Sequence, residues 1–177
     1  MRVRRATERD INGILRLLVQ VDMVHHNGRP DLFKGPATKY NADELREIIK
    51  DDTKPVFVCV EDEDNVNDVN EGICVEPVSH NDTVVLGHAF CIHQQINNNP
   101  VMTDVRTLYI DDICVDENAR GRHIGKLLYD SVLDYARKEG FYNITLNVWS
   151  CNPGAMKFYE AMGLKPQKIG MEKIIKN

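Results

Sequence analysis

The apolar positions near the start of the chain recur with the spacing of an α-helix. Residues 3–6 read as a short strand, and Thr7 and Asp10 then resemble a capping box. The Asn-Gly-Arg-Pro sequence at 27–30 ends the helix that follows, so we expect it to run to about residue 26. One side of this helix carries Ile11, Ile14, Leu15, Leu18 and Val21.

The rest of the chain alternates between helix-like and strand-like segments. A second helix is predicted over 41–50, and the longest amphipathic helix over 121–139, with Gly140 after its end. A short helix is expected at 153–162. The runs rich in β-branched and aromatic residues predict strands over 56–60, 84–96, 105–115, 143–149 and 172–175.

The resulting order, β-α-α-β-β-β-α-β-α-β, predicts a mixed α/β layout. The strands on either side of the helix at 121–139 should be parallel neighbours joined by a right-handed crossover. Their connecting turn would then lie at the edge where open α/β sheets bind ligands. We expect residues 1–177 to form one domain. The acidic, Asn-rich segment at 62–82 has no periodicity, which predicts a surface insertion.

Charge and composition narrow the classes of function. The formal net charge of −5 argues against bulk nucleic-acid binding. No stretch approaches the roughly 20 apolar residues of a membrane span, and no apolar signal region follows the basic start, so we expect a cytoplasmic protein without membrane contact. The segment from Glu61 to Glu71 holds six acidic residues and no basic one. A solvated loop explains this run, and a cation-attracting rim is the alternative.

The cysteines of the chain point to free thiols. There are five, an odd number, and none has C-x-x-C spacing. This pattern favours a reducing compartment over a framework of disulfides. Because no cluster of Cys and His has the spacing of metal ligands, we also expect no metal site.

Residues 110–126 join a strand to the long helix through a basic turn that contains two glycines. Gly121 and Gly125 allow a ligand to approach the backbone, and a helix start offers unpaired N–H groups and the positive end of its dipole. These features suit a phosphate group. Two known phosphate-binding motifs, the P-loop and the dinucleotide fingerprint, are excluded because their glycine spacing differs from the spacing in this turn.

The same turn resembles the acyl-CoA pyrophosphate loop of the GNAT superfamily of N-acetyltransferases, which reads Gln/Arg-x-x-Gly-x-Gly/Ala. Here the sequence is Arg120-Gly121-Arg122-His123-Ile124-Gly125, with His123 at the position of the usual middle glycine. The Cβ of a histidine restricts the backbone angles at this position.

Residues 152–164 resemble a second GNAT segment, Asn-x-x-Ala-x-x-Phe-Tyr-x-x-x-Gly-Phe, with Leu164 in place of the final aromatic residue. Together the resemblances cover nearly the whole chain outside 62–82. They imply a GNAT fold, which is an α/β fold with a mixed sheet of about six to seven strands flanked by about four helices. They also imply acetyl-CoA as the acyl donor.

The resemblance further implies which residues act. Tyr159 matches the tyrosine that protonates the leaving thiolate, although a core aromatic is the alternative. Asn152 matches a pantetheine contact, although it would also serve as a helix cap. The backbone of the preceding strand would bind pantetheine and the turn would bind the pyrophosphate. The implied acetyl-CoA-binding residues are Ile113, Cys114, Val115, Arg120, Gly121, Arg122, His123, Ile124, Gly125, Lys126 and Asn152.

Asp111 and Asp112 are candidates for deprotonating or binding an amine. They resemble the Glu-Asp pair of spermidine/spermine N-acetyltransferases. In an alternating strand they would face opposite sides, so only one should point into an acceptor pocket. The resemblance favours Asp111 as the catalytic residue, with Asp112 as a substrate-binding residue and two ordinary solvated carboxylates as the alternative. His26 lies where GNAT proteins build the acceptor wall, although a solvated helix end explains it as well.

The sequence therefore predicts an acetyl-CoA-dependent N-acetyltransferase in which an amine attacks directly within a ternary complex. The acidic residues favour a small cationic amine as the acceptor. Two alternatives stay open, a protein or peptide N-acetyltransferase and a non-catalytic acyl-CoA-binding sensor module. A homodimer is an option that no sequence feature requires.

Overall fold

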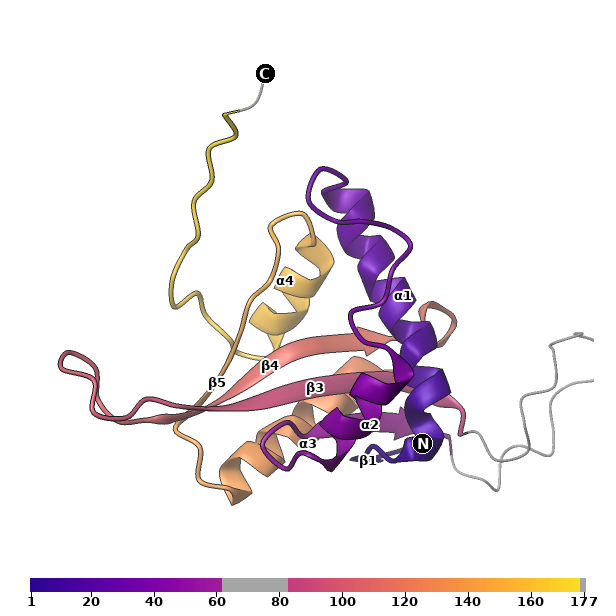
Figure 1. Ribbon diagram of the computed structural model, residues 1–177, viewed down its shortest axis with the longest axis horizontal. Helices are drawn as coiled ribbons and strands as arrows, with labels where there is room; N and C mark the ends of the chain where they lie inside the picture. Colours follow the sequence, from indigo (N-terminus) through magenta and orange to yellow (C-terminus); the bar gives the residue numbers. More distant parts are fainter. Residues whose placement is uncertain (62–82, 176–177) are drawn as a thin grey trace, which may run out of the picture.

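A mixed sheet forms the centre of the molecule (Figure 1). Over residues 1–61 and 83–175, which the computed structural model describes, this sheet has five strands in the order β1-β2-β3-β4-β5. Neighbouring strands are antiparallel except β4 and β5, which are parallel. The strands are β1 (Arg2–Arg5), β2 (Val56–Val60), β3 (Val85–Gln95), β4 (Arg106–Val115) and β5 (Asn143–Leu146).

Helices cover both faces of the sheet. On one face, α1 (Ile11–Gly28) and α2 (Ala42–Lys50) pack through a cluster that includes the fully buried Leu17 and Leu45. On the other, α3 (Ile124–Lys138) packs through Leu128 and Val132, which are also fully buried. The last helix, α4 (Pro153–Ala161), adds Phe158 to the α3-side cluster. Two short 3₁₀ turns, η1 (Glu8–Asp10) and η3 (Glu117–Ala119), precede α1 and α3.

The mixed α/β layout and the parallel pair around α3 are confirmed. Thr107–Ile110 of β4 pair in parallel with Asn143–Leu146 of β5, and α3 connects the two strands. The apolar stripe of α3 explains this crossover, because Ile124, Leu128, Val132 and Ala136 recur at helical spacing and are buried against the sheet.

Two expectations from the sequence are wrong, and a third concerns residues that the structure does not describe. The sheet has five strands in the described residues rather than six to seven. No strand forms over 172–175, because Glu172 pairs with Arg29 at the end of α1, at 2.9 Å, and the segment meets no sheet edge there (Figure 1). The surface insertion expected at 62–82 lies outside the described residues. That residues 1–177 form one domain stays a prediction.

A buried carboxylate fixes the start of the chain on α1. Asp10 is fully buried and accepts two hydrogen bonds from Arg4, at 2.7 and 2.9 Å, and one from the backbone N–H of Thr7 at 2.7 Å. Burial alone would raise the pKa of Asp10, but these donors hold it below its usual value. The Thr7–Asp10 motif thus joins β1 to the first helix.

None of the helices over the described ranges is long and apolar enough to cross a bilayer.

Candidate active site

The turn after β4 places two residues in left-handed backbone conformation directly before α3. Gly121 has φ +82° and His123 has φ +60°. The helix therefore begins at Ile124, whereas the apolar pattern alone predicted a start at residue 121. A left-handed histidine is uncommon because its Cβ crowds the backbone, so this turn is held in place by its surroundings.

The start of α3 presents unpaired backbone donors. His123 makes no side-chain cap, and among the described residues the N–H groups of Ile124, Gly125 and Lys126 meet no acceptor. Only the next N–H, that of Leu127, bonds back to the carbonyl of His123, at 3.1 Å. Three adjacent donors at the positive end of a helix form a suitable site for an anion.

Helix α4 packs against this turn through Phe158. A Cβ at Gly125 would lie 3.4 Å from the Phe158 ring and 3.7 Å from Val115, so glycine allows the helix start, β4 and α4 to meet closely. The contact fixes α4, and therefore Tyr159, relative to the unpaired donors.

The basic side chains of the turn already have acidic partners. Arg122 lies 2.7 Å from the Glu61 carboxylate, and Lys126 lies 2.5 Å from Asp130 one turn along α3. Both pairs are exposed, so each is weakly held and exchangeable. Arg120 is also exposed at the surface of the turn.

The edge of β4 that faces β5 is open at its C-terminal end. Pairing with β5 stops at Ile110, so within the described residues Ile113–Val115 have a neighbouring strand, β3, on one side only. Unpaired peptide groups on a strand edge can bind an extended ligand. The Cys114 side chain is buried toward α1, where burial raises its pKa to about 12, so Cys114 can contribute only backbone at this edge.

Asn152 caps α4. Its Oδ1 accepts a hydrogen bond from the N–H of Ala155 at 3.1 Å, which confirms the capping interpretation. The expected contact with pantetheine stays a prediction.

Tyr159 lies half-buried on α4, with its ring 5.3 Å from that of Phe158. Burial and, next, the charge of Asp112 raise the pKa of Tyr159 well above its ordinary value. The hydroxyl is therefore protonated at neutral pH, and the negative charge of Asp112 on β4 opposes its ionisation.

A β-bulge places Asp111 and Asp112 on the same face of the sheet. Phe90 pairs with Asp112 and the next residue, Cys91, pairs with Ile110, so Asp111 is the extra residue. The expectation that the two carboxylates face opposite sides is therefore wrong, because it assumed an unbroken alternation. Both carboxylates lie on the α1–α2 side, among the residues that contact Phe90.

The two carboxylates have different partners. Asp111 accepts a hydrogen bond from Lys39 Nζ at 2.6 Å and one from the Tyr40 hydroxyl at 3.3 Å. Asp112 lies 2.9 Å from His88 Nε2. Partial burial lowers the pKa of Lys39, but Asp111 more than offsets it, so the pKa lies above its usual value and Lys39 is charged.

His26 supports the loop between α1 and α2. Its Nδ1 lies 2.8 Å from the Phe33 carbonyl, and a Cβ at Gly35 would collide with its ring at 2.6 Å. The Phe33 ring meets Trp149, beyond β5, at 5.1 Å. The loop thus reaches across to the β5–α4 connection, and the expected role of His26 in binding the acceptor stays a prediction.

Sequence reasoning missed three residues that contact the carboxylates, namely Lys39, Tyr40 and His88. Lys39 and Tyr40 lie in a loop without periodicity, so no signal marked them. His88 shares a strand face with Phe90 at a spacing of two, and that alternation was the one available signal.

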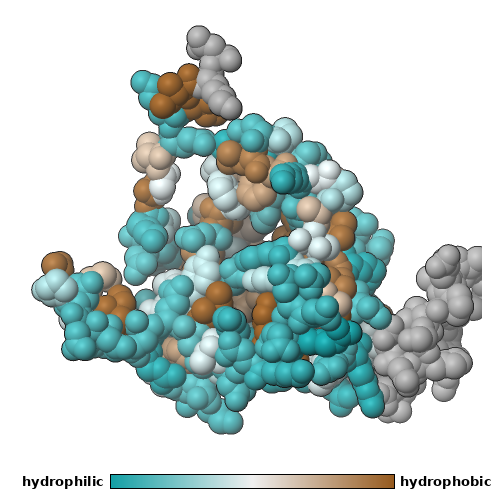
Figure 2. Space-filling view, in the orientation of Figure 1, coloured by the Kyte–Doolittle hydropathy of each residue, from teal (hydrophilic) through white to brown (hydrophobic). Residues whose placement is uncertain are grey.

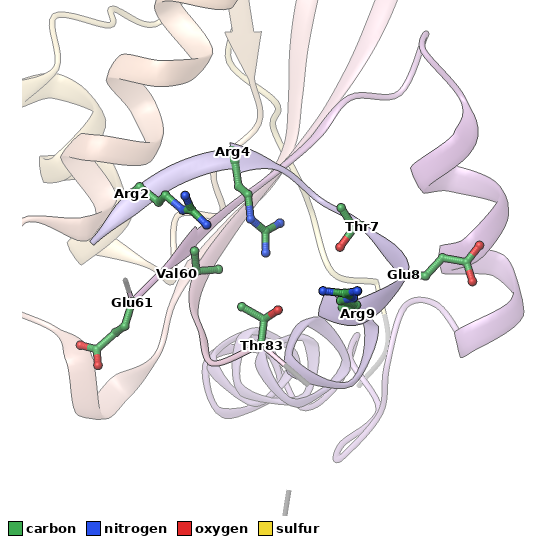
Figure 3. Close-up of a pocket in the computed structure, with 8 residues that line it drawn as sticks. All are labelled: Arg2, Arg4, Thr7, Glu8, Arg9, Val60, Glu61 and Thr83. Atoms are coloured by element: carbon green, nitrogen blue, oxygen red, sulfur yellow. The ribbon is translucent and has the colours of Figure 1, made fainter. Parts of the chain in front are cut away.

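A surface cavity of about 390 Å³ lies beside β1, apart from the predicted site residues (Figure 3). Arg2 and Arg4 project from β1 over it, whereas Glu61 points away from them, toward its pair with Arg122. The lining residues are Arg2, Arg4, Thr7, Glu8, Arg9, Val60, Glu61 and Thr83. None of them was assigned to the donor or acceptor site from the sequence.

Comparison with known proteins gives the same family as the sequence motifs. The model of the acetyltransferase (GNAT) family matches residues 31–164. The N-acetyltransferase MJ1207 of Methanocaldococcus jannaschii is 37% identical over 60 residues, which are 34% of this chain and 26% of that protein. Glucosamine 6-phosphate N-acetyltransferase of Arabidopsis thaliana is 31% identical over 65 residues, 37% of this chain and 42% of that protein. The matched segments span less than half the length of these relatives.

Solved structures agree in fold. A tetramutant of the BH1408 protein from Bacillus halodurans has a TM-score of 0.83 at 26% identity, over 99% of this chain and 100% of that one. An aminoglycoside acetyltransferase from an uncultured soil metagenomic sample has a TM-score of 0.65 at 16% identity, over 99% and 96% of the two chains. The second likeness shows the fold alone.

Proposed function

Because this chain belongs to the acetyltransferase (GNAT) family, we propose that it moves an acetyl group from acetyl-CoA to the primary amine of a small cationic molecule. Family membership makes the chain an acyltransferase. One observation carries the choice of acceptor, which is the pair of carboxylates, Asp111 and Asp112, that the β-bulge brings to one face of β4. Since Lys39 already pairs with Asp111, the charge of one carboxylate, that of Asp112, is left to attract an ammonium group.

The turn before α3 and the open edge of β4 form the proposed acetyl-CoA site. The unpaired N–H groups of residues 124–126 suit the pyrophosphate, with the other residues of the turn, 120–123, around it. The edge at 113–115 suits the amide groups of the pantetheine arm, and Asn152 stands at the start of α4 beyond it. Acetyl-CoA supplies a thioester whose carbonyl carbon an amine can attack.

The chain's own side chains handle the protons. Tyr159 is the proposed donor to the leaving thiolate, and this role is supported by its match to the family's tyrosine and by the contact of Phe158 that places α4 beside the donor turn. The ammonium of the acceptor must first lose a proton, which we assign to a carboxylate of β4. On resemblance alone this residue would be Asp111, with Asp112 binding the acceptor, but Lys39 already pairs with Asp111 at 2.6 Å.

A small acceptor is favoured over a peptide. The relative from Arabidopsis thaliana is named for glucosamine 6-phosphate, a small amine. The loop between α1 and α2 also closes one side of the carboxylate pair through Lys39 and Tyr40. A peptide acetyltransferase and a non-catalytic acyl-CoA sensor are the alternatives that the experiment below separates.

The C-terminal tail is the feature that favours a homodimer. Residues 164–175 form no helix or strand, and the tail runs clear of the sheet in Figures 1 and 2, with an exposed ion pair between its Glu172 and Arg29 at the end of α1. Its apolar side chains are 65–91% exposed, namely Ile169, Met171, Ile174 and Ile175. Since β5 has a free outer edge within the described sheet, the tail of one copy can pair with β5 of a second. Light scattering at several concentrations tests this, and a monomer at all of them contradicts it.

The deciding experiment is calorimetric titration with acetyl-CoA, followed by a panel of amines and peptides with thiol release monitored. We expect saturable binding and thiol release with small cationic amines. Release with one peptide alone would favour the protein-modifying alternative. Binding without release on any acceptor would favour the sensor module, and an absence of binding would contradict the proposed donor site.

A further inference from the structure

His88 is a histidine at the centre of the sheet with one ring nitrogen unpaired. Its side chain is fully buried on β3, and its Nε2 lies 2.9 Å from Asp112 Oδ2. Its Nδ1 is buried and has no hydrogen-bond partner among the described residues. The ring meets Phe90 edge-on at 5.0 Å. Such orphaned groups are rare in folded proteins and call for an explanation.

The chemistry of the two partners assigns the proton on the ring. An ionised carboxylate only accepts hydrogen bonds, so Nε2 must carry the hydrogen that it shares with Asp112. Nδ1 is then a bare lone pair without a donor, so its burial is not compensated by a hydrogen bond. A purely packing role would be filled without this cost by an apolar side chain. The feature that distinguishes His88 from an apolar residue is therefore its hydrogen bond to Asp112.

The bulge gives Asp112 a different situation from Asp111. Asp111 is neutralised by the Lys39 ammonium at 2.6 Å and also accepts from Tyr40. Among the described residues, Asp112 has only His88 as a side-chain hydrogen-bond partner, through one oxygen. Its second oxygen thus keeps its accepting capacity and its charge. The charge of Asp112 also acts on Tyr159, whose pKa is raised first by burial and then by this carboxylate.

We propose that His88 is a positioning residue, which holds Asp112 so that its carboxylate, and not that of Asp111, receives the proton lost by the acceptor amine. This inference rests on the proposed function. The acceptor nitrogen loses two protons in all. The first goes to Asp112, the nitrogen–carbon bond forms and the carbon–sulfur bond breaks, and Tyr159 protonates the sulfur. Asp112 then returns its proton to the Tyr159 oxygen through water, and the second nitrogen proton leaves to solvent.

The test compares two substitutions at His88 with one at a second histidine of the same strand. His88→Leu fills the space and removes the donor, so we expect kcat to fall by about 10- to 100-fold with the KM for acetyl-CoA unchanged. His88→Gln offers an amide N–H near the position of Nε2 and should restore most of kcat. His93→Gln serves as the control, because His93 bonds Tyr135 at 2.9 Å on the opposite face.

A spectroscopic readout accompanies the kinetics. Nitrogen NMR of the imidazoles should show His88 as the Nε2–H tautomer, and Asp112→Asn should change its signals while leaving those of His93 unchanged. Equal kcat values for wild type and His88→Leu would overturn the proposal. So would an equal loss in both His88 variants, which would mean packing, or an equal loss in His93→Gln. A wild-type protein without thiol release would instead remove the proposed function itself.

Discussion

Lys39 Nζ lies 2.6 Å from Asp111 Oδ2, so a lysine of the chain is paired with the carboxylate that the family resemblance assigns to catalysis. An acceptor ammonium must compete with Lys39 for that oxygen. We expect Lys39→Met to lower the KM of a cationic amine by about 2- to 5-fold, which is the range of one partly exposed ion pair. Steady-state kinetics at fixed, saturating acetyl-CoA measure this.

The matched control is Lys54→Met. Lys54 pairs with Asp51 at 3.3 Å and is as exposed as Lys39, but it lies outside the site. A KM that rises in Lys39→Met would mean that Lys39 helps to hold the acceptor and would contradict the competition.

Gly125 leaves the start of α3 open toward its unpaired N–H groups. Gly125→Glu would push against Phe158, 3.4 Å from the new Cβ, and would place a negative charge beside the proposed pyrophosphate site. We expect acetyl-CoA affinity to fall by on the order of 100-fold, because like charges at an interface cost several kcal/mol. Titration calorimetry on the folded variant measures it.

The same substitution at Gly170 makes the control, since a Cβ there meets nothing within 4 Å. Unchanged affinity in a folded Gly125→Glu variant would remove the donor site from this turn.

Features set by residues close together in the sequence were predictable, and features set by contacts between distant residues were not. Helix α3 was predictable because Leu128 and Val132 lie on one apolar stripe, which is a local property. The position of the donor turn followed from the parallel crossover, again through local pattern. The left-handed φ of His123 was not readable, since non-glycine residues adopt it uncommonly and no local pattern marks this position.

The acceptor site was less predictable because it depends on contacts between residues that are far apart in the sequence. The bulge at Asp111 depends on the register of β4 against β3, so no pattern within β4 reveals it. Lys39 and Asp111 are 72 positions apart, and nothing in the loop before α2 marks the contact. The segment at 172–175 has the composition of a strand but forms none, because a strand also needs an edge to pair with.

Asp10 should make folding stability depend on pH at the acid end. Its pKa is lowered in the folded state, so its stabilising effect is complete above the unfolded value of about 3.9 and is lost as the pH falls through the folded value. We expect Asp10→Asn to lower the free energy of unfolding by about 3 kcal/mol at pH 7. This difference from wild type should shrink below about pH 4 in urea titrations.

Asp52→Asn is the control for Asp10. Asp52 is fully exposed and only 3.8 Å from Arg5, so its removal should leave the urea midpoint unchanged at every pH. A pH-independent loss in Asp10→Asn would mean that packing, and not the charge, is what Asp10 contributes.

Tyr159→Phe should separate catalysis from binding. Loss of the hydroxyl should lower kcat by about 100-fold, because the leaving thiolate loses its proton donor, while the dissociation constant of acetyl-CoA stays the same. Tyr135→Phe is the control, since its hydroxyl contacts His93 far from the carboxylates. Equal losses of kcat and affinity in Tyr159→Phe would assign the residue a packing role.

The pH dependence of turnover gives a second, independent view of Tyr159. Because burial and then Asp112 raise its pKa, the alkaline loss of activity due to its ionisation should come at a pH above the ordinary tyrosine value of about 10. Asp112→Asn removes the neighbouring negative charge, which must make the phenolate easier to form. The alkaline limb of kcat should therefore move to lower pH in that variant, even though its overall rate is reduced. If the limb stays in place, the charge of Asp112 does not reach the Tyr159 hydroxyl, and the proton return from Asp112 to Tyr159 has no physical basis.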